Sequence, residues 1–207
     1  KLKNLKKEYD NLDIGLRFTI LPSNYKKMIE VYDLAKSLNI GFVAKPAMTG
    51  GYFDNKSDDF SFTPEQKTEI ISTLKKIVER EQRELELAKG RSIIADIKHI
   101  SFIDFLEYSI RFIVDPTKQI FPCYANFSSV FLENTGEVYT CQILYRKIGD
   151  LRKNSFDEIW QSKESHDARE FIKQGKCVCF TNCNQIPSLI ISKFPKIMLK
   201  RFSKKLF

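Results

Sequence analysis

The cysteines are the residues of this sequence whose type and spacing could do chemistry. All five lie within one stretch, at positions 123, 141, 177, 179 and 183, and none occurs in the first 122 residues. Cys179 and Cys183 are four residues apart, so on a helical turn they share one face, and Cys177 can reach the same point from the preceding loop. Converging thiolates of this kind hold zinc or an iron–sulfur cluster. A single cysteine is often only a small buried hydrophobe, but five in one local unit favour a metal site.

The composition narrows the class of protein. The chain has 207 residues, of which 43% are hydrophobic and 29% charged, which excludes a disordered or fibrous protein. The most apolar stretch, 102–114, is interrupted by Asp104, Glu107 and Arg111, so we expect no membrane span. An odd number of cysteines argues against a secreted disulfide module, so we expect reduced thiols and a cytoplasmic protein. Because the sequence opens at Lys1 inside an amphipathic stretch, we interpret it as a fragment of a longer protein.

A hairpin is expected to position the first two cysteines. Residues 128–133 and 137–142 have the character of strands, and Asn134-Thr135-Gly136 between them supplies a glycine for the turn. Cys123 precedes this hairpin and Cys141 lies at the end of its second strand.

A helix is expected to position the other three cysteines. Residues 148–151 form a compact connector, and Asn154-Ser155 caps a helix that ends at Gly175. Cys177 follows two residues later, so the late cysteines come directly after a helix C-terminus.

The region before residue 62 predicts a β-α-β unit. A strand at 14–20, a helix over 25–38 and a second strand at 40–44 fit the pattern that forms parallel sheets. Ligands bind at the carboxyl ends of such strands, which places residues 19–23 and 45–51 on the ligand side.

Two helices follow this unit. A long polar loop at 47–62 has no periodicity of its own, and its role cannot be read from the sequence. Thr63 and Pro64 begin a helix that runs to about Ala88, and a further helix is predicted over 101–114. We place a domain boundary at 115–121.

The cysteine spacing resembles a known family. Cys123, followed by twelve residues to Gly136 and four more to Cys141, is similar to the first half of the SPASM or twitch motif, which follows the barrel of many radical S-adenosylmethionine enzymes. The tract from Ile148 to Trp160 resembles the connector of those domains, and the last three cysteines resemble its closing thiols.

The resemblance implies a fold and a cofactor. It implies an α/β chain in which a partial (β/α) barrel remnant of the radical enzymes precedes a small β-hairpin plus helix module. Cys123, Cys141 and two of the three late cysteines, with Cys179 and Cys183 favoured, would hold one auxiliary [4Fe–4S] cluster. The implied segments are the barrel part at 1–62, barrel-end and linker helices at 63–118, the cluster domain at 119–190 and a basic amphipathic tail at 191–207.

The resemblance also implies a longer parent enzyme. The CxxxCxxC motif, which in the family binds the cluster that cleaves S-adenosylmethionine, does not occur in these 207 residues, and we expect it upstream of Lys1. The fragment is therefore not expected to be catalytically competent alone. The parent would take S-adenosylmethionine, a second [4Fe–4S] cluster, a reductant protein and a peptide or small-molecule substrate. Arg17, Thr19 and Lys45 are the candidates to approach S-adenosylmethionine, although each also fits an ordinary polar position at a strand end. The rival interpretation is a non-catalytic zinc module, which the spacing alone allows equally well.

Other polar residues have simpler interpretations. We expect His99 and His166 to lie at the surface, because neither has a partner at metal spacing. The run 79–86 is interpreted as the exposed face of a long helix. The aspartates of the polar loop lack a calcium-loop pattern and are expected to be solvated: Asp54, Asp58 and Asp59.

The net charge of +8 is concentrated in the tail. Six of the 34 basic residues follow Ser192, with no acidic residue among them. The rest of the chain is close to neutral, so we expect no nucleic-acid partner. The tail has the pattern of a segment that contacts an anionic membrane surface, but packing on its own protein is the favoured interpretation.

Overall fold

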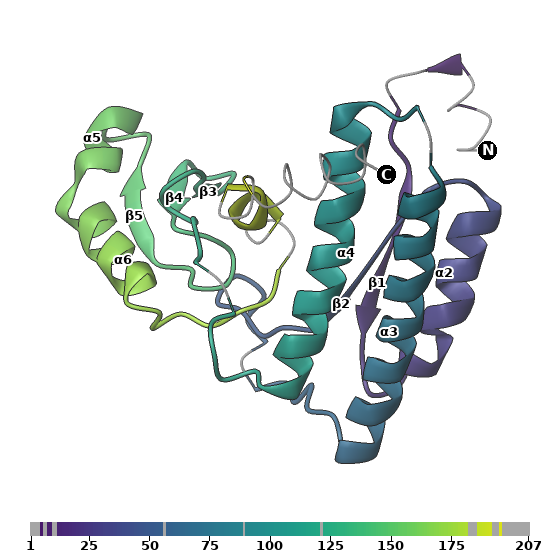
Figure 1. The fold of residues 1–207 in the computed structure, drawn as a ribbon. Helices are drawn as coiled ribbons and strands as arrows, with labels where there is room; N and C mark the ends of the chain where they lie inside the picture. The colour runs from purple at the N-terminus through teal and green to yellow at the C-terminus, as the bar shows by residue number, and fades with distance from the viewer. Residues whose placement is uncertain are drawn as a thin grey trace. The chain divides into compact units, whose positions relative to one another are not determined.

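The fold was analysed in a computed structural model that describes residues 5, 8, 9, 12–55, 57–88, 90–120, 122–181, 186–191 and 195. The chain divides into two compact units (Figure 1). The first consists of Lys1–Ala47 and Phe60–Val114, and the second of Met48–Asp59 and Asp115–Phe207. None of the described helices combines the length and apolar character that a membrane span requires.

The first unit contains the predicted β-α-β arrangement. Strands β1 (Gly15–Ile20) and β2 (Gly41–Pro46) pair in parallel, with Gly15 opposite Gly41 and Thr19 opposite Lys45. A 3-10 turn, η1 (Tyr25–Lys27), leads into helix α2 (Met28–Ser37) between them. The parallel pairing confirms the expectation for these strands.

The two faces of this small sheet differ. Side chains alternate along each strand, and the face carrying Ile20, Phe42 and Ala44 is buried in a core built from the helices. The opposite face carries Arg17 and Thr19, which are exposed.

Helix α3 (Pro64–Leu87) begins as predicted. The Thr63 hydroxyl accepts a hydrogen bond from the Gln66 backbone N–H, and the Gln66 side chain accepts one from Thr63 N, so the cap is a complete capping box. Its apolar stripe packs against α2 and the sheet and consists of Ile70, Leu74, Ile77 and Val78.

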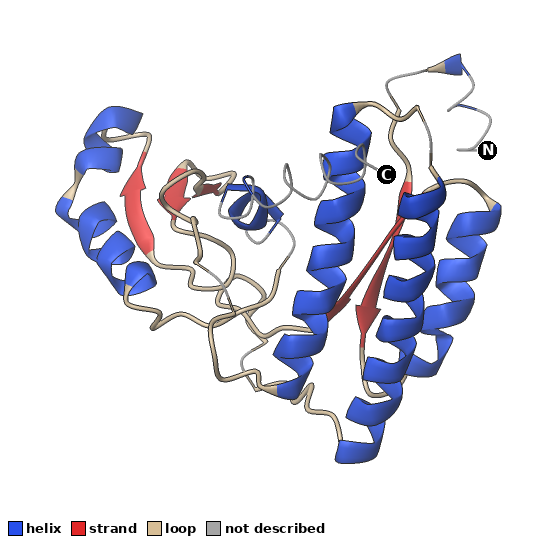
Figure 2. Ribbon diagram, in the orientation of Figure 1, coloured by secondary structure: helices blue, strands red, loops and turns tan. Residues whose placement is uncertain are grey.

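Helix α4 (Ile93–Val114) begins earlier than expected (Figure 2). The sequence predicted a start near Ser101, which was wrong. The Ser92 hydroxyl accepts a hydrogen bond from Ala95 N at 3.2 Å and so provides an N-terminal cap upstream.

Glu81 of the first unit is buried and the His99 side chain is only 9% exposed, contrary to expectation. Glu81 is 4% exposed, although the run 79–86 was expected to be a solvated face, and His99 was expected at the surface. His99 Nε2 lies 2.6 Å from Glu81 Oε2, and Arg91 donates to His99 Nδ1 over 2.7 Å. Since Arg91 can only donate, the ring carries its proton on Nε2, facing the carboxylate. The two side chains are largely buried because each satisfies the other. His166 is exposed, as predicted.

The second unit is built on a three-stranded antiparallel sheet. The hairpin of β3 (Phe131–Leu132) and β4 (Glu137–Tyr139) confirms the prediction, with shorter strands. The predicted connector at 148–151 lies mostly within a third strand, β5 (Lys147–Asp150), which pairs with β4. The sequence predicted a connector here and not a strand, because the segment is only four residues long.

The predicted single helix of this unit is two helices. Helix α5 (Phe156–Gln161) ends at Ser162, whose extended backbone stops it and whose hydroxyl caps α6 (Lys163–Lys173) by accepting from Ser165 N. Ile159 of α5 packs on Gly149 of β5 so closely that a Cβ there would lie 2.5 Å from Ile159 Cγ1. The glycine therefore brings helix and sheet together.

Candidate metal centre

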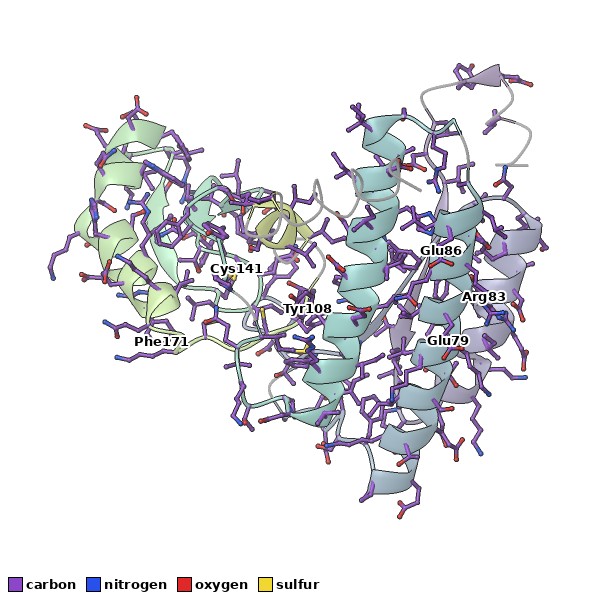
Figure 3. All side chains as sticks on the ribbon, viewed as in Figure 1. Glu79, Arg83, Glu86, Tyr108, Cys141 and Phe171 are labelled. Atoms are coloured by element: carbon purple, nitrogen blue, oxygen red, sulfur yellow. The ribbon has the colours of Figure 1, made fainter. Side chains whose placement is uncertain are left out.

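Cys141 belongs to the second unit (Figure 3). It lies two residues after the end of β4, is 6% exposed and packs with Ala125 and with Ile172 of α6. Cys123 packs against the same group. The hairpin unit thus brings together the two cysteines that the sequence assigned to it.

Cys177 joins this pair from the end of α6. Gly175 takes a φ of +69°, which terminates the helix and turns the chain. Burial, and then the negative charges of Cys141 and Cys123, raise the pKa of the Cys177 thiol to about 12. These three sulfurs are therefore close enough to feel one another's charge.

The thiols fit a metal centre by ligand type. Cys123 and Cys141 pack in one group and Cys177 follows α6, and ionising neighbouring thiols without a cation is unfavourable. Without a metal Cys177 stays protonated at neutral pH, and ligation would replace that proton with positive charge. In a bound cluster, the positive charge of the iron ions would offset the repulsion between the thiolates.

The Cys141 sulfur accepts a hydrogen bond from the backbone. Leu144 donates its backbone N–H to Cys141 Sγ at 3.3 Å, and Tyr145 donates its N–H to the Cys141 carbonyl at 3.0 Å. The turn over 142–144 therefore wraps around the thiol. Hydrogen bonds to ligand sulfurs are among the features that set the potential of an iron–sulfur centre.

The remaining cysteines are placed only in part. Cys179 is half-buried and precedes the fully buried Phe180. Cys183 lies outside the described residues, as does most of the predicted basic tail. Among the residues that are described, no three His, Cys, Asp or Glu side chains form a group that could hold a single metal ion.

A polar framework fixes the segment after Cys123 on α6. Asn126 is fully buried and donates from Nδ2 to the Ser165 carbonyl at 3.0 Å. Arg169 donates to the Asn126 carbonyl at 2.7 Å and to the Trp160 carbonyl at 2.8 Å, while its guanidinium stacks on the Trp160 ring. Sequence reasoning missed Asn126; its left-handed φ of +59° gives no signal in the sequence beyond the residue type.

An apolar pocket of about 530 Å³ opens beside Cys123. Tyr124, Phe127 and Ile172 supply most of its apolar wall, and Lys173 of α6 supplies a cation. Cys123 is itself one of the residues that line this pocket.

The other candidates belong to the first unit. Arg17 and Thr19 are exposed and Lys45 is half-buried. The parallel register places Thr19 opposite Lys45, so all three lie on the face of the sheet turned away from the helical core. Asp54 and Asp58 of the polar loop are exposed, as expected.

Comparison with known families identifies this region. Residues 123–184 match the family model of SPASM, an iron–sulfur cluster-binding domain. The match spans every cysteine of the chain and confirms the resemblance predicted from their spacing. No curated protein and no solved structure matches the chain. Residues 123–184 are therefore similar to the SPASM domain, and this match indicates that they bind an iron–sulfur cluster.

Proposed function

We propose that the SPASM domain holds one auxiliary [4Fe–4S] cluster. Cys123, Cys141 and Cys177 are three of its ligands, and either Cys179 or Cys183 is the fourth. The observation that carries this proposal is the packing of Cys123 and Cys141 in one group within the stretch that matches the SPASM model. Cys177 follows α6 within the same stretch, so we add it to the ligand set, in which the resemblance favoured Cys179 and Cys183.

The chain's own residues define what the site does. When bound, such a cluster would supply one-electron chemistry. The three thiolates hold it, Leu144 donates to one of its ligand sulfurs, and the apolar surround of Ala125 and Ile172 limits water at Cys141.

We propose further that the first unit is the last part of a radical S-adenosylmethionine barrel. In a barrel, one face of each parallel strand meets the outer helices and the other lines the interior. The buried face of β1 and β2 and the opposite face with Arg17, Thr19 and Lys45 support this assignment. In the parent enzyme these three side chains would approach S-adenosylmethionine.

Several properties of the parent follow as parts of the same proposal. A second [4Fe–4S] cluster would start the radical reaction. The CxxxCxxC motif that binds it does not occur in this sequence, so another part of the parent would hold that cluster and this stretch would not be competent alone. A reductant protein would supply electrons, and the substrate would be a peptide or small molecule. We also propose a cytoplasmic location, which a cluster held by reduced thiols supports.

Anaerobic reconstitution with iron and sulfide tests the cluster. We expect about four irons and four sulfides per chain and a brown absorbance. Zinc is measured in the same sample, and one zinc without colour would favour the zinc module instead.

Single Cys→Ala variants test the ligand set. Cys141→Ala and Cys177→Ala should lose the cluster. Comparing Cys179→Ala with Cys183→Ala identifies the fourth ligand, since only one of the two should lose iron. Full iron content in Cys177→Ala would contradict its assignment as a ligand.

A further inference from the structure

The loop at 48–59 is part of the cluster module. Although it follows β2 in the chain, it groups with the second unit, where its backbone bonds to the turn that wraps Cys141. Gly51 donates its N–H to the Ile143 carbonyl at 3.0 Å, and Tyr52 donates to the Gln142 carbonyl at 3.1 Å. We call residues 50–52 the clamp.

Glycine is required for the clamp to approach this closely. A Cβ on Gly51 would lie 2.5 Å from Tyr145 Cβ, an atom fixed to the backbone that cannot swing away. A Cβ on Gly50 would lie 2.9 Å from Ile143 Cδ1. Contacts under 3.0 Å force a displacement, so a side chain at Gly51 must push the turn away.

The side chain of Asn55 stabilises the loop from within. Asn55 accepts a hydrogen bond from Gly50 N at 2.9 Å and donates to the Met48 carbonyl at 3.3 Å. This side chain folds 48–55 back on itself and presents the clamp. On the other side, the Tyr52 ring meets the Phe131 and Tyr145 rings edge-on, at centroid distances of 4.9 and 5.8 Å.

One peptide group, between Ile143 and Leu144, connects the clamp to Cys141 Sγ. The Ile143 carbonyl and the Leu144 N–H belong to one planar trans unit and point in opposite directions. Gly51 holds the carbonyl end, and the N–H end points at Cys141 Sγ, 3.3 Å away. A donor on the carbonyl also polarises the N–H and strengthens its bond to sulfur.

The turn adopts an unusual backbone, which indicates that it is held from outside. Tyr145 has a φ of +46°, a left-handed conformation that is uncommon for an aromatic residue. Its ring stacks on Tyr139 at 4.1 Å between centroids, and its hydroxyl donates to Glu133 at 2.6 Å. Contacts on both sides of the turn therefore offset the cost of this conformation.

We propose that Gly51 is a positioning residue that aims the Leu144 N–H at Cys141 Sγ and thereby raises the reduction potential of the cluster. A hydrogen bond to a ligand sulfur favours the reduced cluster, which carries the more negative charge. The inference rests on the cluster assignment made above. It gives the loop at 48–59 a role that is distinct from ligation.

The test is a redox titration of the reconstituted full chain, followed by absorbance and electron paramagnetic resonance. Gly51→Ala should keep its iron and sulfide but titrate at a lower midpoint potential than the unsubstituted chain, with an altered resonance spectrum. Gly41→Ala is the matched control, because a Cβ there meets only ordinary contacts of 3.6 Å or more. It should leave both readouts unchanged.

A second variant tests the role of the loop at 48–59 independently. Asn55→Ala adds no atoms and should lower the potential in the same direction, so the proposal stays testable if Gly51→Ala fails to fold.

The outcomes separate this inference from the proposed function. An unsubstituted chain that takes up no iron overturns both. A chain with a full cluster whose potential is the same in Gly51→Ala or in Asn55→Ala overturns the positioning role and leaves the cluster assignment intact.

Discussion

The buried carboxylate of Glu81 should contribute a large share of the first unit's stability. Tyr32 donates to it at 2.7 Å and Lys36 at 3.1 Å, and His99 lies 2.6 Å away. Burial alone would raise the pKa of Glu81, but the hydrogen bonds from His99 and Tyr32 and the charge of Lys36 outweigh it and lower the pKa to about 2. Against its ordinary value of 4.5, and at about 1.4 kcal/mol per pKa unit, this lowering is worth about 3 kcal/mol.

The sign of the pH dependence follows from the direction of that change. A carboxylate whose pKa is lower in the folded state stabilises the fold above pH 4.5, and the contribution is lost as the pH falls toward 2. Glu81→Gln should therefore lower the free energy of unfolding by about 3 kcal/mol at pH 7. The difference between variant and unsubstituted chain should shrink between pH 4.5 and 2.

Urea denaturation followed by far-UV circular dichroism measures this difference, since α3 and α4 contribute much of the helical signal. Glu79→Gln is the control on the same helix (Figure 3). Its side chain is 62% exposed and 3.9 Å from Arg83, so we expect a loss below about 0.5 kcal/mol. If Glu81→Gln loses no more than this control, or if its deficit does not change with pH, the account of the buried carboxylate is wrong.

Three further predictions concern packing, capping and metal. Gly149→Ala forces a Cβ against Ile159 and should cost about 1–3 kcal/mol, measured by the shift of the fluorescence transition of the single tryptophan, with Gly41→Ala as the unaffected control. Thr63→Ala removes the side chain that caps α3 and should cost about 1 kcal/mol in urea denaturation, whereas an unchanged midpoint would mean that Gln66 alone suffices. Removing the metal from the reconstituted chain with a chelator should lower the melting temperature, because a ligand that binds only the folded state stabilises it. An identical melting temperature after chelation would contradict ligation by the folded domain.

Local signals in the sequence predicted the elements that depend on neighbours in the chain. The Thr63 capping box, the buried stripe of α3 and the strands β1 and β2 needed only residues a few positions apart. The cysteine spacing predicted the family because the ligand type and the lengths of the connections carry that information.

Pairings between distant residues were not predictable in the same way. Glu81 and His99 look like solvated residues in their own helices, and their burial depends on a partner that only the packed helices provide. The third strand β5 was missed because it is four residues long and its glycine packs on Ile159 of α5, a contact that leaves no periodic pattern.

The identity of the metal centre and its tuning are encoded differently. The proposed ligands are side chains, so Cys123, Cys141 and Cys177 can be picked out as candidates from the sequence. The bond from Leu144 to sulfur is made by backbone, and it is aimed by a glycine whose contribution is the side chain it lacks. Substitutions in the loop at 48–59 should therefore change the potential of the cluster while leaving its iron content unchanged. Substitutions of the ligand cysteines should instead lower the iron content itself.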